Sequence, residues 1–178
     1  MKKIAVALLL SALAAPAFSA DEGLYAGINV GGSKTDSSIG AAVLTKTTDT
    51  SYGILLGYLF NKNFAVEAQY TDLGKFEKGA TTGKNNVFAL SLVGIVPVAD
   101  AFSLYAKLGY ANARSSMSNT AATGASRSGV TYGVGGQYDF TPAIGVRLGW
   151  DQYEAALNDP AKQNYKVSNW NIGAVFKF

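Results

Sequence analysis

The sequence predicts an all-β protein: an eight-stranded antiparallel up-and-down transmembrane β-barrel. Three observations carry this prediction. The N-terminus is a short apolar leader, the rest of the chain alternates apolar and polar residues at period two, and the connections alternate between short and long. Hydrophobic residues make up 48% of the chain, which is too apolar for a disordered protein.

The first twenty residues have the pattern of a secretory signal peptide. Lys2 and Lys3 give a basic start, Ile4 to Leu10 form an apolar run, and Ala20 ends a stretch of small residues before two acidic ones. No later apolar run reaches the roughly 18 residues of a membrane helix. We therefore expect residues 1–20 to be removed and residues 21–178 to form one barrel domain of an exported protein.

Eight segments alternate at period two, as strands with two different faces do. Their lengths are near the roughly 9–11 residues with which a tilted strand crosses a bilayer. Closure of eight strands into a barrel would leave no edge strand. The segments are residues 24–31, 52–60, 64–70, 88–92, 104–110, 130–138, 144–150 and 170–178.

The connections predict how the barrel lies in the membrane. Residues 61–63, 97–101 and 141–142 are expected to be tight turns, and residues 32–51, 73–85, 115–128 and 154–165 long polar loops. A signal peptide and a transmembrane barrel together indicate the outer membrane of a diderm bacterium. Both termini would then be periplasmic, and the four long loops would be extracellular.

The apolar set is expected to face lipid, because a narrow eight-stranded barrel has little room inside for so many large side chains. The other set is rich in Gly, Asn, Ser, Thr and Gln, which suits a narrow polar interior. Aromatic residues with the parity of the apolar set cluster at both strand ends, as in the two girdles of a membrane barrel. Those toward the long loops are Tyr52, Tyr70, Phe88, Tyr110, Tyr132, Trp150 and Trp170, and those toward the short turns are Phe60, Phe64, Phe102, Tyr138, Phe140, Phe176 and Phe178.

Three charged residues share the inward parity at similar depth: Glu67, Lys107 and Arg147. Facing lipid near the middle of the bilayer, Lys or Arg would cost about 2–4 kcal/mol each. We expect Glu67 to accept from Arg147, with Lys107 competing or bridged by water, and Tyr105 and Gln137 to extend the hydrogen bonding. A structural interior network is the favoured interpretation, and an ionic plug that gates a small ion pathway is the alternative.

The composition excludes most catalytic chemistry. The chain has no His and no Cys, which removes Ser-His and Cys-His arrangements, disulfides and the usual metal ligands. We expect no enzyme activity, no cofactor and no metal. Without the leader, 13 basic side chains face 12 acidic ones, which leaves no basic surface for nucleic acid.

Several segments resemble the transmembrane domain of the outer membrane protein A (OmpA) family. Residues 57–74 resemble its second and third strands, residues 103–109 its fifth strand, and residues 138–142 with 145–148 its sixth-to-seventh turn. The closing Phe178 resembles the terminal aromatic residue that the outer-membrane assembly machinery recognises. The resemblance covers nearly the whole chain after the leader.

The resemblance implies an eight-stranded barrel, surface loops used in adhesion or as phage and antibody targets, and weak channel activity. Its interior gate corresponds to Glu67 with Arg147, and to the basic Lys107. Two positions depart from the family: Gln137 stands where the family has an acidic partner for the fifth-strand cation, and the inward Lys of the fourth strand is missing around Val93. The chain ends at Phe178, so the family's periplasmic peptidoglycan-binding domain is not expected.

These observations leave three functions open. The leading hypothesis is a structural and interaction protein whose loops contact host cells, phage or matrix. The alternatives are a low-conductance pore gated by Glu67, Arg147 and Lys107, and a soluble-type barrel that binds a small apolar ligand. The expected partners are outer membrane lipids with lipopolysaccharide and, through the C-terminal strand, the assembly machinery. The expected oligomeric state is a monomer.

Overall fold

The protein is described by a computed structural model that covers residues 22–39, 42–43, 47–78, 81–117, 125–155 and 165–178. The expected signal peptide lies outside the described residues. All regular structure in the described ranges is β-strand. In these ranges, no helix is long and apolar enough to cross a membrane.

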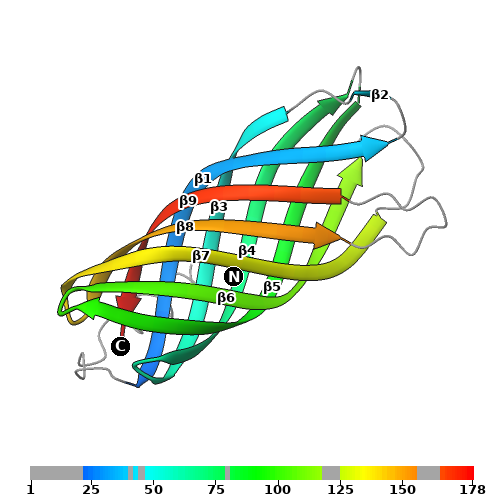
Figure 1. Cartoon of the computed structure of the whole chain (residues 1–178). Helices are drawn as coiled ribbons and strands as arrows, with labels where there is room; N and C mark the ends of the chain where they lie inside the picture. Colours follow the sequence, from blue (N-terminus) through cyan, green and yellow to red (C-terminus); the bar gives the residue numbers. More distant parts are fainter. Residues whose placement is uncertain (1–21, 40–41, 44–46, 79–80, 118–124, 156–164) are drawn as a thin grey trace, which may run out of the picture.

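Eight long strands form one antiparallel sheet that closes on itself (Figure 1). Each strand pairs with the next in sequence, and β1 pairs with β9 as well as with β3. The short strand β2 (Ala42–Val43) pairs only with the end of β1. The eight strands are β1 (Gly23–Ile39), β3 (Thr47–Asn61), β4 (Phe64–Lys78), β5 (Thr81–Ala99), β6 (Phe102–Met117), β7 (Ala125–Thr141), β8 (Ile144–Ala155) and β9 (Tyr165–Lys177).

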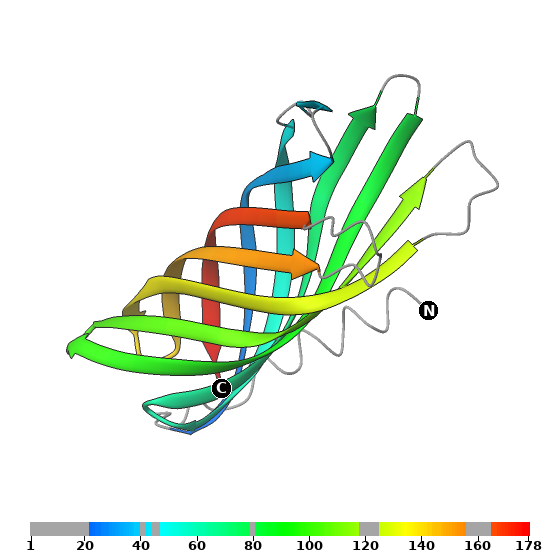
Figure 2. The same ribbon diagram turned by 45° about the vertical axis from the view of Figure 1, so that its right-hand side comes forward.

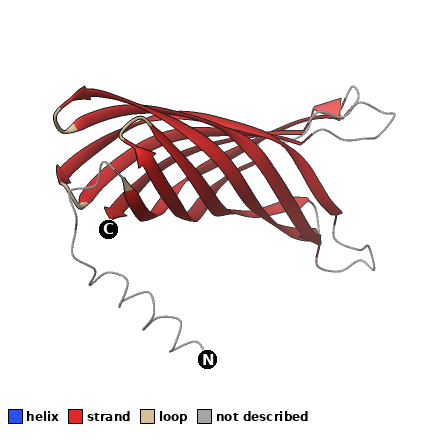
Figure 3. Ribbon diagram, turned by 90° about the horizontal axis from the view of Figure 1, so that it is seen from below, coloured by secondary structure: helices blue, strands red, loops and turns tan. Residues whose placement is uncertain are grey.

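The seam between β1 and β9 closes the barrel. Its pairing runs from Tyr25 opposite Lys177 to Ser37 opposite Tyr165. Beyond the end of β9, the N–H of Phe178 donates to the carbonyl of Leu24 at 2.9 Å. The strands run obliquely around the axis (Figures 2 and 3). The eight-stranded up-and-down barrel predicted from the sequence is confirmed.

The two faces of the wall divide as predicted. Large apolar side chains cover the outside, where Leu92 is 70% exposed and Leu108 is 62% exposed. Their neighbours in sequence point inward, where Val93 is 1% exposed. An outside of this kind cannot face water over its whole height, so it is the surface that meets lipid.

The short turns lie at the end where β1 begins and β9 ends. The side chain of Asn61 accepts from the N–H groups of Asn63 and Phe64, at 2.8 and 3.0 Å, and Thr141 binds the N–H groups of the third turn in the same way. The turn expected over residues 97–101 is shorter than predicted, because β5 runs to Ala99. A register shift follows Pro97, which has no N–H to give to the ladder.

The long loops are also shorter than predicted, because the strands continue into them. The loop expected over residues 73–85 is largely a hairpin in which Lys78 pairs with Thr81. A register shift follows Asp72, and Gly74 adopts a positive φ of 82° there. Beyond the lipid both faces meet water, so polar strands rich in Thr and Ser persist without the alternation that marks a membrane strand.

A closed transmembrane barrel should survive cold sodium dodecyl sulfate as a compact species. We expect the band of the outer-membrane fraction to shift in apparent mass when the sample is boiled, and an aliquot unfolded in urea to serve as the unfolded standard. A single unshifted band, with the protein soluble in the periplasm, would contradict the assignment of the outer and inner faces.

Candidate functional site

A buried ion pair crosses the lumen between two opposite walls. Arg147 on β8 pairs through Nη1 with Oε1 of Glu67 on β4. The hydroxyl of Tyr25 on β1 donates to the same Oε1 at 2.6 Å. Glu67 is 1% exposed and Arg147 is 5% exposed. The structure therefore brings together the two residues that the sequence pairs.

The guanidinium of Arg147 is held by two further residues named from the sequence. Its Nε and Nη2 donate to Oε1 of Gln137, at 3.1 and 3.0 Å, because Gln137 lies directly opposite on β7. The ring of Tyr105 lies 4.6 Å below the guanidinium carbon, within the range of a cation–π contact. The Tyr105 hydroxyl donates to the carbonyl of Leu148 at 3.3 Å.

Glycines on the inner wall make room for both tyrosines. A Cβ on Gly57 would lie 2.1 Å from the ring of Tyr25, and a Cβ on Gly135 or Gly149 would lie 2.4 Å from the Tyr105 hydroxyl. A side chain at any of these positions would displace a ring that contacts Arg147. The inward glycines thus position the ion pair, although they contribute no polar group to it.

Lys107 forms a second ion pair instead of competing for Glu67. Its Nζ lies 2.8 Å from Oδ1 of Asp151 on β8 and 2.8 Å from Oε1 of Gln69 on β4. Asn171 donates to the other carboxylate oxygen of Asp151 at 2.9 Å. The sequence reasoning did not name Asp151 as a partner of Lys107, and in the structure Asp151 supplies the acid that is missing at Gln137.

The contact between Lys107 and Asp151 passes over a glycine. Lys107, Gly133 and Asp151 are successive partners in register on β6, β7 and β8. A Cβ on Gly133 would lie 2.3 Å from Asp151 Oδ1 and 2.9 Å from Lys107 Cε. The sequence shows the inward parity of Lys107, Gly133 and Asp151, but only the register of β6, β7 and β8 aligns them.

A vestibule opens at the short-turn end of the lumen. It has a volume of about 490 Å³ and reaches inward to Tyr25, Tyr105 and Arg147. At its side, Lys177 pairs with Asp139 at 2.7 Å, and Gln137 also donates to Asp139 at 2.7 Å. The lumen is thus open from the short-turn end as far as the pair of Glu67 and Arg147.

The lumen is more apolar than the predicted polar interior. A cluster on the long-loop side joins residues of β4, β5, β6, β8 and β9, so it crosses the lumen. A second cluster surrounds the first ion pair. The long-loop cluster contains Leu73, Val87, Ala89, Ala111, Tyr153 and Val167, and the second contains Tyr25, Leu55, Leu59, Ala65, Val93, Tyr105 and Val175.

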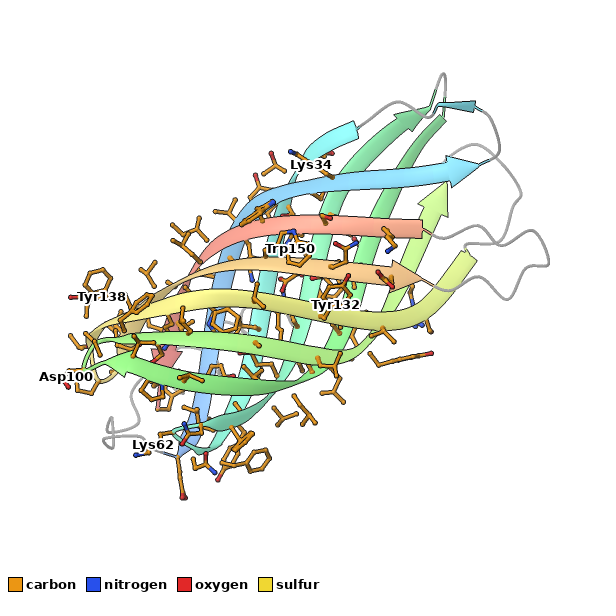
Figure 4. All side chains as sticks on the ribbon, viewed as in Figure 1. Lys34, Lys62, Asp100, Tyr132, Tyr138 and Trp150 are labelled. Atoms are coloured by element: carbon orange, nitrogen blue, oxygen red, sulfur yellow. The ribbon has the colours of Figure 1, made fainter. Side chains whose placement is uncertain are left out.

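The predicted girdle residues lie on the outer wall. Trp150 packs between two neighbours, with ring centroids 6.0 Å from Tyr132 and 6.3 Å from Trp170. Figure 4 shows Tyr132 and Trp150 farther from the short turns than Tyr138. Tyr132, Trp150 and Phe176 are half-buried. The exposed members are Tyr52, Tyr70, Phe88, Tyr110 and Trp170 toward the loops, and Phe60, Phe64, Phe102, Tyr138 and Phe140 toward the turns.

The arrangement holds its charges in fixed pairs. Each lumenal cation described above contacts a carboxylate, and the two inner pairs are connected to amide side chains. Within the described ranges, no three His, Cys, Asp or Glu side chains lie close enough to hold a metal ion. Chemically, the lumen can stabilise the barrel or, by exchanging partners, admit small ions.

Solved structures with the same fold are similar to this chain. The neisserial surface protein A (NspA) has a TM-score of 0.73 at 18% identity, with 88% of this chain and 97% of that chain covered. Ail of Yersinia pestis, the attachment invasion locus protein, has a TM-score of 0.59 at 19% identity, with 88% and 99% covered. The outer membrane enzyme PagL has a TM-score of 0.53 at 15% identity, with 86% and 99% covered.

The family comparison covers nearly the whole sequence. No curated protein sequence matches the chain. The model of the outer membrane protein beta-barrel domain matches residues 5–178. This family implies the outer membrane of a Gram-negative bacterium. The chain therefore belongs to the outer membrane protein beta-barrel domain family.

Proposed function

We propose that the protein is a rigid, non-enzymatic scaffold that presents its long-loop end to other cells, phage or extracellular matrix. The observation that carries this proposal is the continuation of paired strands beyond the aromatic girdle at that end. With the long-loop end outside the cell, both termini of the barrel are periplasmic. A barrel that presents a surface needs a stiff wall there, and hydrogen-bonded strands provide one.

The hairpins at this end extend well past the girdle. On β4 the pairing continues from Tyr70 to Lys78, which is eight residues farther along the strand. At about 3.3 Å per residue this is roughly 26 Å of strand. The β6–β7 hairpin likewise stays paired as far as Ser115 and Ala125. Figure 1 shows these strands projecting at one end of the barrel.

The contents of the lumen favour a scaffold function over a pore or an enzyme. Packed apolar side chains cross it on the long-loop side, and its charges are paired below. The chain has no His to act as a general base. PagL is an enzyme with a similar fold, so the fold does not decide whether a barrel is catalytic. The lack of enzyme activity is therefore part of what we propose for this protein.

The proposal includes partners at both ends of the barrel. Lipopolysaccharide surrounds the outer wall, and the assembly machinery reads the C-terminal strand with Phe178, whose backbone joins the β1 seam. The protein acts as a monomer. NspA is named as a surface protein and Ail as an attachment protein bound to a heparin analogue, which makes heparin a sensible first surface to test.

Removing one partner of the buried pair should destabilise the scaffold strongly. We expect R147A to lower the free energy of unfolding by about 3–5 kcal/mol, because it leaves Glu67 charged and buried without its cation. The measurement is urea unfolding in lipid vesicles, followed by tryptophan emission. The matched control is K166A, which breaks the exposed pair with Glu154 and should change stability little. Equal effects of R147A and K166A would show that the interior pair is dispensable.

The loops should carry attachment independently of the barrel. Replacing residues 118–124 and 156–164 each by Asn-Gly should leave the gel shift intact while attachment of expressing cells to heparin- and fibronectin-coated surfaces falls to that of cells without the protein. A control with K62A, at the opposite end, should attach normally. Attachment that is unchanged by the loop replacements would contradict the proposal.

A low-conductance pore is the second candidate, and the vestibule that ends at Arg147 favours it. Ions entering from the short-turn end would meet the Glu67–Arg147 pair first and the Lys107–Asp151 pair next. The apolar cluster with Val87 and Val167 then narrows the lumen, so the conductance would be small.

If the barrel conducts, E67A should raise its conductance. The substitution frees the Arg147 side chain from its carboxylate partner and opens space in the charged layer. Single-channel recording in planar bilayers compares the unsubstituted barrel with E67A, and the gel shift verifies that the variant is folded. Electrical silence of both proteins would rule out the pore.

A further inference from the structure

The outer wall carries an apolar groove on its loop-proximal half. The groove has a volume of about 580 Å³, within the roughly 300–1,000 Å³ of ordinary ligand sites. Val134, Leu148 and Ile172 line it, and each of them is exposed. It is therefore a local depression in the surface that faces lipid, spanning β1, β7, β8 and β9.

The groove owes its shape to large and small side chains placed side by side. Trp150 and Trp170 lie directly opposite each other on β8 and β9 and bound it on the loop side. One row closer to the short turns, Leu148 lies opposite Gly136 on β7. Gly136 has the outward parity but no side chain, and a Cβ there would lie 3.2 Å from the ring of Phe102, which borders the depression on the side of β6.

A cation lies beyond the tryptophans, on the side of the long loops. Lys34 on β1 is exposed and lies opposite Ser168 on β9, two residues past Trp170. Lys166 pairs with Glu154 at 2.9 Å, whereas no ion pair of Lys34 is found among the described side chains. In Figure 4, Lys34 lies farther from the short turns than Trp150, and far from Lys62 at the other end.

We propose that this groove is a specific lipid site, which takes one acyl chain of an anionic, phosphate-bearing lipid and holds its negatively charged headgroup at Lys34. The occupant follows from the surroundings. The groove is continuous with the lipid-facing wall, and tryptophans of a girdle lie at the depth where acyl chains meet headgroups. A Lys just beyond them is at the level of the phosphates, to which a basic side chain is attracted.

The two tryptophans make the occupancy directly measurable, because they are the only ones in the chain. The purified barrel in detergent micelles is titrated with phosphatidylglycerol or phosphatidylcholine whose acyl chains carry bromine, which quenches nearby indole emission. We expect saturable quenching, with half-saturation at about five-fold less phosphatidylglycerol than phosphatidylcholine, the effect of one basic residue at the membrane surface.

Two variants and two matched controls separate the groove from bulk lipid contact. G136L should abolish the saturable part by filling the groove, and K34A should abolish the preference for phosphatidylglycerol. G94L places the same side chain on the outer wall of β5, where the nearest atom is 4.0 Å from a new Cβ, and K62A removes an exposed Lys at the short-turn end. Both controls should behave like the unsubstituted barrel, and the gel shift confirms that all four variants fold.

Three results would overturn the proposal. Quenching that rises without saturation and is equal in G136L would show ordinary contact with surrounding lipid. An equal affinity for the two lipids in the unsubstituted barrel would remove Lys34 from the site. Emission that resists quenching, in a particle of twice the expected protein mass, would show that a second copy of the chain covers the groove.

Discussion

A strand in lipid cannot leave its backbone N–H and carbonyl groups unpaired, and the rest of this structure depends on that constraint. The sheet must close, and here β1 pairs with β9 to do so. Closure with eight strands makes a lumen so narrow that side chains fill it. Every inward position must therefore fit against the opposite wall, which explains why Gly57, Gly135 and Gly149 stand where two tyrosines cross.

The same narrowness decides where the charges lie. Arg147 is almost completely buried at the inner end of the vestibule, so Glu67 neutralises it across the barrel and Gln137 and Tyr105 complete its contacts. The side chain of Lys107 is also largely buried, at a different depth, and its charge is neutralised by Asp151 across Gly133. One apolar cluster surrounds the first ion pair, and the other fills the lumen on the long-loop side. The outer wall follows a different rule, since lipid accepts any apolar shape and so permits depressions such as the one at Gly136.

The sequence predicts what the membrane imposes and misses what the geometry of closure imposes. Lipid on one face enforces alternation, so the strands through Leu92 and Leu108 and the inward parity of Glu67 and Arg147 follow from period two. The Lys107–Asp151 pair depends on the stagger between β6 and β8, which the parity of single strands does not contain. The strand beyond Tyr70 was missed because water on both faces removes the alternation from which strands were recognised.

The buried charges also select the register of the strands. Two apolar clusters show that Leu and Val can fill this lumen, and replacing a buried pair by apolar residues is often neutral for stability. A one-residue slip of β8 between its neighbours, however, would turn Arg147 and Asp151 toward lipid, where the Arg alone would cost about 2–4 kcal/mol. A strand whose inward side chains are all apolar could slip by one residue without moving a charge into lipid. The ion pairs thus stabilise one pairing of the wall against its alternatives, and this holds whether or not ions ever pass between them.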